Sequence, residues 1–221
     1  MKKNTKKTLN KNEVSQVIEL LDRAYPDAGC ELDYDSVYHL LIAVVLSAQT
    51  TDVSVNKVTP ALFEKFTSIE SLASADSNDV EAVIKTIGLY KSKARNIIKL
   101  SEKLLNDFNG EVPSTFEELI SLPGVGRKTA NVVLAEAFGE QRIAVDTHVF
   151  RVSNRIGLVC EKDVLSTEQS LMKVIPRKKW SRTHHLLIIH GRRCCNARKP
   201  DCTNCPTSSL CLENHDSHLL Q

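Results

Sequence analysis

Five of the seven cysteines lie between residues 194 and 211. Four of them follow the pattern C-x6-C-x2-C-x5-C, namely Cys195, Cys202, Cys205 and Cys211. Thiolates are soft ligands that select zinc or iron–sulfur clusters. Structural zinc sites more often use two C-x2-C pairs, whereas this loop has one, so the spacing predicts a metal site without choosing between the two. Cys194 is an alternative first ligand.

A glycine turn between two predicted helices is a second candidate site. Pro123-Gly-Val-Gly126 separates helical patterns at Phe116–Leu122 and Arg127–Phe138, which together predict a helix–hairpin–helix. Gly124 and Gly126 are expected to adopt backbone angles closed to other residues and to let another backbone come close. The first amides of the second helix carry partial positive charge, which suits a DNA phosphate. A plain connection between helices is the alternative.

Lys128 and Asp146 are the candidate catalytic residues. Lys128 falls in the first turn of its predicted helix, where the helix dipole disfavours an ammonium and favours the neutral amine. A neutral lysine amine can form a Schiff base, although most lysines in such positions only contact phosphate. Asp146 follows the apolar run Ile143–Val145 and either caps the next helix or stabilises a cation and accepts a proton.

The net charge of +2 conceals a basic segment from residue 177 to residue 199. It contains no acidic residue and eight basic ones: Arg177, Lys178, Lys179, Arg182, Arg192, Arg193, Arg198 and Lys199. Such a segment attracts a polyanion, most often nucleic acid. A solvated basic surface without a partner is the alternative.

The elements that must position these residues are predicted to be almost entirely helical. Apolar spacing predicts further helices over Val14–Tyr25, Val53–Phe66 with a break at Pro60, Ser77–Ile87, Ser92–Phe108, Thr167–Val174 and Ser181–His190. Tyr38–Leu46 is apolar nearly all round and fits a buried helix or a buried strand. Ile143–Val145 is expected to form at most an isolated extended bridge. The helix after Asp146 carries Val149, Val152 and Ile156.

Two classes of protein are excluded, namely integral membrane proteins and secreted proteins. The longest apolar run, Leu40–Leu46, is far short of the roughly 18 residues of a membrane span. The basic N-terminal stretch, with weak expected affinity for polyanions, is followed by no apolar segment and is not a secretory signal. The clustered cysteines therefore indicate metal in a reducing compartment rather than disulfides, and isolated Cys30 and Cys160 are expected to be buried thiols.

These features, in this order, resemble the endonuclease III family of helix–hairpin–helix DNA glycosylases. The resemblance rests on Leu46–Asp52 (LSAQTTD), Leu122–Asn131, Val145–Arg151 and the loop Cys195–Cys202, and extends from about residue 12 to Cys211. The sequence departs from the family at Thr50, where relatives often have a smaller residue, at the additional thiol of Cys194, and in its longer basic tail.

The resemblance implies an all-α fold with two lobes. Residues 30–140 would form a six-helix barrel that contains the helix–hairpin–helix at about 116–139. Residues 1–29 and 141–221 would form the second lobe, with the cysteine loop 195–211 holding a [4Fe-4S] cluster through the four cysteines of the pattern. The cluster would be a scaffold that presents Arg198 and Lys199 to phosphates.

The implied activity is removal of oxidised pyrimidines from double-stranded DNA, followed by cleavage at the resulting abasic site. Lys128 would attack C1′ and Asp146 would assist it across a groove between the lobes. Gln49 and Leu89 would fill the gap left by the flipped base. The remaining DNA contacts are expected from Gly124, Val125, Gly126 and His148. A monomer in the cytoplasm, associated with the nucleoid in a bacterium, is the expected setting.

Three alternatives remain open. An adenine-mismatch glycosylase of the same superfamily would lack a lysine at position 128 and would carry a further C-terminal domain. A non-catalytic DNA-binding protein with a structural cluster would be favoured by loss of Lys128 or Asp146, and both are present. A zinc-bound DNA-binding regulator would be colourless when purified.

Overall fold

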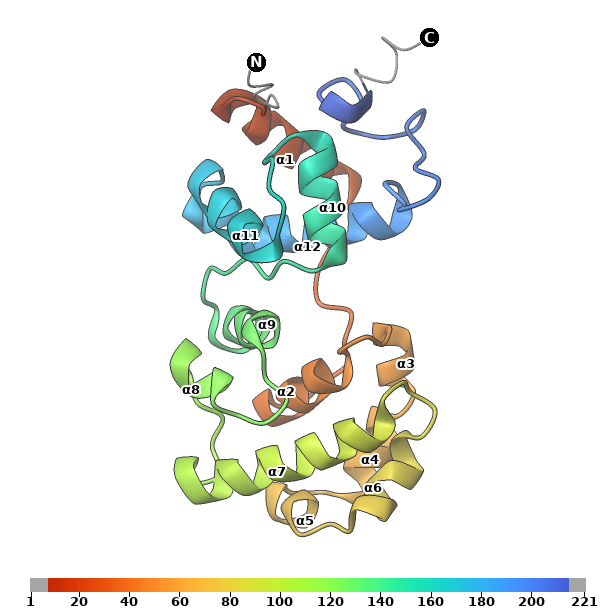
Figure 1. The fold of residues 1–221 in the computed structure, drawn as a ribbon, viewed down its shortest axis with the longest axis vertical. Coiled ribbons are helices and arrows are strands. Elements are labelled where there is room, and N and C mark those ends of the chain that lie inside the picture. Colours follow the sequence, from red (N-terminus) through yellow and green to blue (C-terminus); the bar gives the residue numbers. More distant parts are fainter. Residues whose placement is uncertain (1–7, 215–221) are drawn as a thin grey trace. The chain divides into compact units, whose positions relative to one another are not determined.

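The computed structural model describes residues 8–214, so the basic tail at residues 1–7 lies outside the described residues. Within the described range, the chain forms twelve α-helices and one short 3-10 helix, and no strand. The predicted all-α class is confirmed. The chain divides into two compact units: a central unit, Glu31–Glu140, and a terminal unit made of Met1–Cys30 with Gln141–Gln221 (Figure 1).

The central unit is built around one buried helix. Its helices are α2 (Val37–Leu46), α3 (Asp52–Asn56), α4 (Thr59–Lys65), α5 (Ile69–Ala73), α6 (Ser77–Ile84), α7 (Tyr90–Phe108), α8 (Phe116–Ile120) and α9 (Arg127–Phe138). Residues 40–46 of α2 are all buried, and α2 packs against α7 and α9. The Ser36 side chain caps α2 by accepting a hydrogen bond from the His39 amide. The apolar run is therefore a buried helix, the first of its two predicted forms.

The predicted helix over residues 53–66 is two helices. The helical structure is interrupted at Lys57 and Val58. Pro60 falls in the first turn of α4, where its missing amide hydrogen is not needed. Helix α5, which packs against α7, is not predicted by apolar spacing. Its boundary comes from a capping box in which Ser68 and Ser71 bond each other's backbone amides.

The terminal unit joins the two ends of the chain. Its helices are α1 (Lys11–Ala24), α10 (Thr147–Ile156), α11 (Val164–Val174), the 3-10 helix η1 (Arg177–Lys179) and α12 (Trp180–Arg193). Helix α12 packs against both α1 and α10 (Figure 1). Residues 143–145 are buried but irregular, because they have no neighbouring strand to pair with. This agrees with the expectation of at most an isolated extended bridge.

Two arginines of the basic segment fasten α12 to the N-terminal segment. The Arg182 guanidinium pairs with Asp22 at 2.7 Å and donates to the Tyr25 carbonyl at 3.0 Å. Arg193 pairs with Asp27 through two hydrogen bonds of 2.8 and 3.1 Å, which holds the pKa of that carboxyl below its usual value. These two cations stabilise the terminal unit, so the segment is not solely a surface for polyanions.

No helix in the described part of the chain is both long enough and apolar enough to cross a membrane.

Candidate functional site

The helix–hairpin–helix lies in the central unit, formed by α8, the turn at residues 121–126 and α9. Gly124 has φ +79°, and a Cβ there would come within 3.1 Å of both Asn96 and Val45. Glycine is therefore required at this position by backbone conformation and by space. The Leu122 carbonyl accepts a hydrogen bond from the Val125 amide at 3.1 Å, which closes the turn.

Gly126 does not share the expected backbone requirement. Its φ of −100° and ψ of 178° are extended angles that any residue adopts, which corrects that prediction. A Cβ added there would meet nothing within 4 Å, so the space beside the turn is open. Gly126 precedes α9 and offers no side chain to cap it, which leaves the first turn of α9 suited to an external anion.

Val125 is buried and its amide is used within the turn, so it supports the hairpin, and its DNA contact remains a prediction. Lys128 is exposed in the first turn of α9.

Gln49 and Leu89 lie on two neighbouring loops of the central unit. A Cβ added to Gly88 would lie 4.0 Å from the Gln49 carbonyl oxygen. Both residues have left-handed backbones, with φ of 55° and 60°, and both side chains are exposed, Leu89 to 58%. The structure thus brings together two predicted DNA-inserting residues that are 40 positions apart in the sequence.

Asp146 begins α10 in the terminal unit. Its Oδ1 accepts hydrogen bonds from the amides of His148 at 2.9 Å and Val149 at 2.8 Å. Its Oδ2 lies 3.4 Å from His148 Nδ1, and the Asp146 side chain is 15% exposed. The capping role is confirmed, and the two amide hydrogen bonds hold the carboxylate in place at the start of α10.

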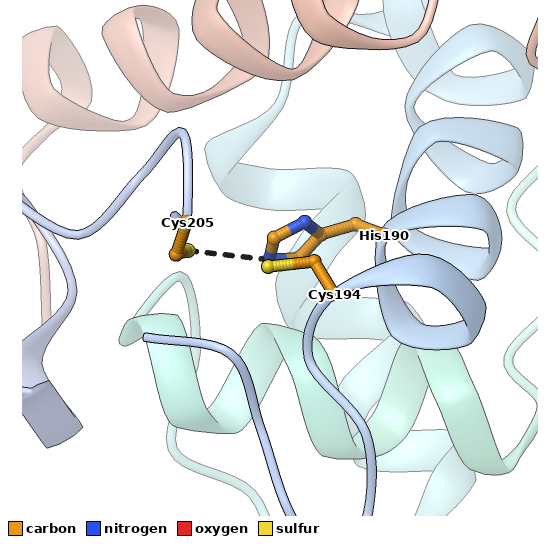
Figure 2. A group of neighbouring side chains, drawn as sticks. All are labelled: His190, Cys194 and Cys205. Carbon is orange, nitrogen blue, oxygen red and sulfur yellow. Dashed lines mark hydrogen bonds between the residues drawn. The ribbon is translucent and has the colours of Figure 1, made fainter. Parts of the chain in front are cut away.

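All five clustered cysteines line one cavity of about 290 Å³ in the terminal unit, together with Arg155 and His190. The ligand atoms of His190, Cys194 and Cys205 lie within 4.8 Å of one another. Figure 2 shows these three side chains meeting, with Cys205 Sγ 3.7 Å from His190 Nε2. Cys194 thus shares the cavity with the predicted ligands, and its thiol donates to the Asp201 carbonyl at 3.3 Å.

Burial controls the protonation of these groups. It lowers the pKa of His190 to about 4, so the ring is neutral, and it raises the pKa of Tyr25 to about 12. The Tyr25 hydroxyl lies 3.0 Å from His190 Nδ1 and orients the ring. Burial also raises the pKa of Cys202 and of Cys211, so thiolates here need a compensating cation. The donor set is consistent with a metal centre.

Two arginines that the sequence analysis did not single out hold the cysteine loop on α10. Arg155 donates to the carbonyls of Asn196 at 2.8 Å and Ala197 at 2.9 Å. Arg151 donates to the carbonyls of Gly191 at 3.0 Å and Cys195 at 3.1 Å. The signal in the sequence that could have identified them is their four-residue spacing, which places both arginines on one face of α10. Arg198 and Lys199 are exposed on the same loop.

The prediction that the two isolated cysteines, Cys30 and Cys160, are buried thiols is wrong. Cys160 is exposed and Cys30 is half-buried, because both lie in connecting segments rather than on apolar helix faces.

Comparison with known proteins agrees with this arrangement. Residues 42–177 match the family model for the HhH-GPD superfamily base excision DNA repair protein. The chain is 48% identical to endonuclease III of Bacillus subtilis (strain 168) over 206 residues, covering 93% of this chain and 94% of the relative. It is also 48% identical to endonuclease III of Escherichia coli (strain K12) over 203 residues, covering 92% and 96%.

Solved structures agree as well. The fold matches a trapped endonuclease III–DNA covalent intermediate with a TM-score of 0.91 and 48% identity, covering 95% of this chain and 99% of that one. A non-covalent endonuclease III–DNA complex matches with the same TM-score. The chain therefore belongs to the endonuclease III family of the HhH-GPD superfamily of base excision DNA repair proteins.

Proposed function

We propose that this protein is a bifunctional DNA glycosylase and abasic-site lyase that removes oxidised pyrimidines, with Lys128 as the nucleophile. The observation that carries the proposal is the exposed Lys128 amine at the start of α9, directly after an open glycine turn suited to a DNA phosphate. The structural relative described as a trapped covalent intermediate supports a covalent step.

The reaction begins with base release. The neutral Lys128 amine attacks C1′ of the damaged nucleotide, the glycosidic bond breaks, and the base leaves with the bonding electrons and takes up a proton. Opening of the C1′–O4′ bond then gives an imine between Lys128 and C1′. Asp146 stabilises the positive charge that develops on the sugar and carries protons during these steps.

Strand cleavage follows from the same imine. The imine acidifies C2′, which loses a proton, and the electron pair forms a C2′–C3′ double bond as the 3′ phosphate leaves. Hydrolysis of the imine by water returns the amine to Lys128. One nitrogen therefore serves both base release and cleavage on the 3′ side of the lesion.

The other assigned residues bind and distort the DNA. The hairpin residues Gly124, Val125 and Gly126 are assigned to the phosphate backbone, and Gln49 and Leu89 to the gap left by the flipped base. His148 is assigned to DNA beside Asp146, which its ring already contacts. We assign the protein to the cytoplasm, because its proposed substrate is chromosomal DNA. We further assign it as a monomer that binds damaged double-stranded DNA.

The cysteine cavity is assigned to a [4Fe-4S] cluster held by Cys195, Cys202, Cys205 and Cys211. All four thiols line one cavity of about 290 Å³, and thiolates are soft ligands suited to an iron–sulfur cluster. A bound cluster would supply iron–sulfur bonds that cross-link this loop and so hold Arg198 and Lys199 in place.

Borohydride trapping tests the activity and the nucleophile together. The protein is mixed with a duplex that contains thymine glycol, and sodium borohydride reduces any imine to a stable adduct. We expect an adduct with the unchanged protein and none with Lys128→Gln, which keeps length and polarity but removes the amine. Lys99→Gln, at an exposed lysine of the same unit, is the matched control and should trap normally.

Two results would contradict the proposal. Trapping of Lys128→Gln at near full yield would mean that another amine is the nucleophile. A protein that binds the damaged duplex but never traps or cleaves it would instead be a non-catalytic DNA-binding protein.

A further inference from the structure

Gln49 and Leu89 occupy an unusual pair of backbone conformations. They are two of only three non-glycine residues with positive φ in the described part of the chain, and the third is Asn109. Asparagine tolerates this region, whereas glutamine and leucine rarely adopt it. Such conformations persist only where surrounding structure enforces them, and they concentrate at functional sites.

Lys93 is the residue that joins the two loops. It lies in the first turn of α7 and is only 4% exposed. Its amide donates to the Leu89 carbonyl at 3.0 Å. At the other end, its Nζ donates to Thr50 Oγ1, next to Gln49, at 2.5 Å.

Burial of this ammonium is otherwise unexplained. No carboxylate within residues 8–214 pairs with Lys93, whose one side-chain acceptor is the Thr50 hydroxyl. Desolvation lowers the pKa of Lys93, as expected for a cation without a countercharge. Removing a cation from water costs free energy unless its contacts in the protein compensate. For Lys93, the hydrogen bond to Thr50 is the side-chain contact that supplies this compensation.

We propose that Lys93 and Thr50 form a clamp that positions Gln49 and Leu89 as a single rigid wedge for the DNA base stack. The inference rests on the proposed function, because the wedge has a role only if the protein unstacks DNA. A gap in the stack must be filled by both side chains at once, and a pre-formed pair does not lose freedom on insertion. Both members of the clamp are positioning residues and touch no reacting atom.

Thr50 contributes one hydroxyl to the clamp from a loop outside the helices. Without this hydroxyl, Lys93 would lose its side-chain acceptor. The fold should therefore tolerate a change at position 50, and the effect should be confined to the loops. This separates the clamp from a general contribution to stability.

The test compares Thr50→Val with Thr50→Ser. Valine keeps the shape of threonine but removes the hydroxyl, and serine keeps the hydroxyl. Each variant acts on two duplexes, one with thymine glycol and one with a preformed abasic site, where no base has to be extruded. We expect Thr50→Val to lower kcat/KM on thymine glycol by roughly 3- to 10-fold, which is the usual effect of losing one hydrogen bond. Cleavage of the abasic duplex should change by less than about twofold, and Thr50→Ser should restore both.

A second readout needs no turnover. A 2-aminopurine placed opposite the lesion becomes brighter when it is unstacked, and Thr50→Val should reduce this increase at saturating protein. Thr50→Ala replaces Thr50→Val if the valine variant melts at a lower temperature. Equal losses on both duplexes, no loss on either, or unchanged fluorescence would overturn the clamp. Absence of excision by the unchanged protein would instead contradict the proposed function, and the fluorescence comparison would still decide the clamp.

Discussion

The two units of this protein differ in how the chain builds them and in which contacts hold them together. The central unit is one continuous stretch, Glu31–Glu140, whose helices pack around the buried helix α2. The terminal unit joins distant parts of the chain, and residues 195–211 have no regular helix of their own. Apolar packing and turn geometry suffice for the hairpin, whereas the cysteine loop relies on arginine contacts to its carbonyls and, by our assignment, on a metal cluster. Replacing a ligand should therefore affect the units unequally.

The largest expected effect is that of Cys202→Ser. The loss of one ligand should remove the cluster and release the loop around it, because ligand binding and folding are coupled. Anaerobically purified unchanged protein should be yellow-brown with nearly equal iron and sulfide, and the variant should contain neither. Hydrogen exchange should rise throughout residues 141–214 and stay slow in α2 and α7 of the central unit.

Cys160→Ser is the matched control, since that thiol is exposed and lies away from the cavity. It should keep both iron and protection from exchange. Stoichiometric zinc without iron in the unchanged protein would exclude the cluster, and uniform exchange in both units of Cys202→Ser would break the contrast between them.

Asp146→Asn should have the next largest effect, on rate alone. Asparagine can accept the same two amide hydrogen bonds and cap α10, so the terminal unit should fold and bind DNA. The lost negative charge should slow base release by about 10²–10³-fold, roughly 3–4 kcal/mol, measured in single-turnover reactions on thymine glycol.

Asp163→Asn separates charge from capping. Asp163 caps α11 in the same unit by accepting from the Ser166 amide at 2.8 Å, and its replacement should leave the rate unchanged. A similar loss from both variants would mean that Asp146 acts only through helix capping.

A pair of glycine substitutions compares the two units directly. Gly157 ends α10 with φ +94°, and an added Cβ would come within 2.7 Å of Leu212 Cγ, whereas Gly139 ends α9 with φ +67° and open space around it. Gly139→Ala should lower the free energy of unfolding by about 1–2 kcal/mol for backbone strain alone. Gly157→Ala should lower it by about 2–4 kcal/mol, because Leu212 must also move. Denaturant unfolding measures both, and equal losses would show that the segment at Leu212 gives way freely.

The smallest expected effect is on the salt dependence of DNA binding. Replacing Arg198 and Lys199 by alanine should reduce the slope of log affinity against log salt by roughly 1–2 units. It should weaken binding to damaged and undamaged duplexes alike. The double variant Lys162→Ala with Lys173→Ala removes the same charge from elsewhere in the terminal unit and should leave the slope nearly unchanged. A normal slope after the first change would mean that the cysteine loop does not contact phosphate.

The sequence predicted most of the helices because their signals are local. Apolar spacing located α7 and α9, and Asp146 was correctly considered as a cap for α10. The run at residues 38–46 stayed ambiguous because a helix buried on every side has no periodic face. Helix α5 was missed because two serines form its capping box, rather than the usual serine and glutamate.

The candidate sites were predictable where residue type alone sets the chemistry. Cysteine spacing predicted that these thiols would lie together, but the presence of His190 in the same cavity depends on how α12 ends. The internal pairing of Arg182 and Arg193 could not be predicted, because their partners are more than 150 residues away. The bond from Lys93 to Thr50 is also non-local, since it joins residues 43 positions apart.

The split origin of the terminal unit sets an order for folding during synthesis. Helix α1 leaves the ribosome first, with Val14, Val17 and Leu21 on a face that α12 covers about 160 residues later. The intervening 110 residues of the central unit can fold meanwhile from their own contacts. The newborn chain therefore holds the proposed nucleophile and wedge loops before it has Asp146 or the cysteine loop. Assembly of the terminal unit around α1 waits until α12 has been translated.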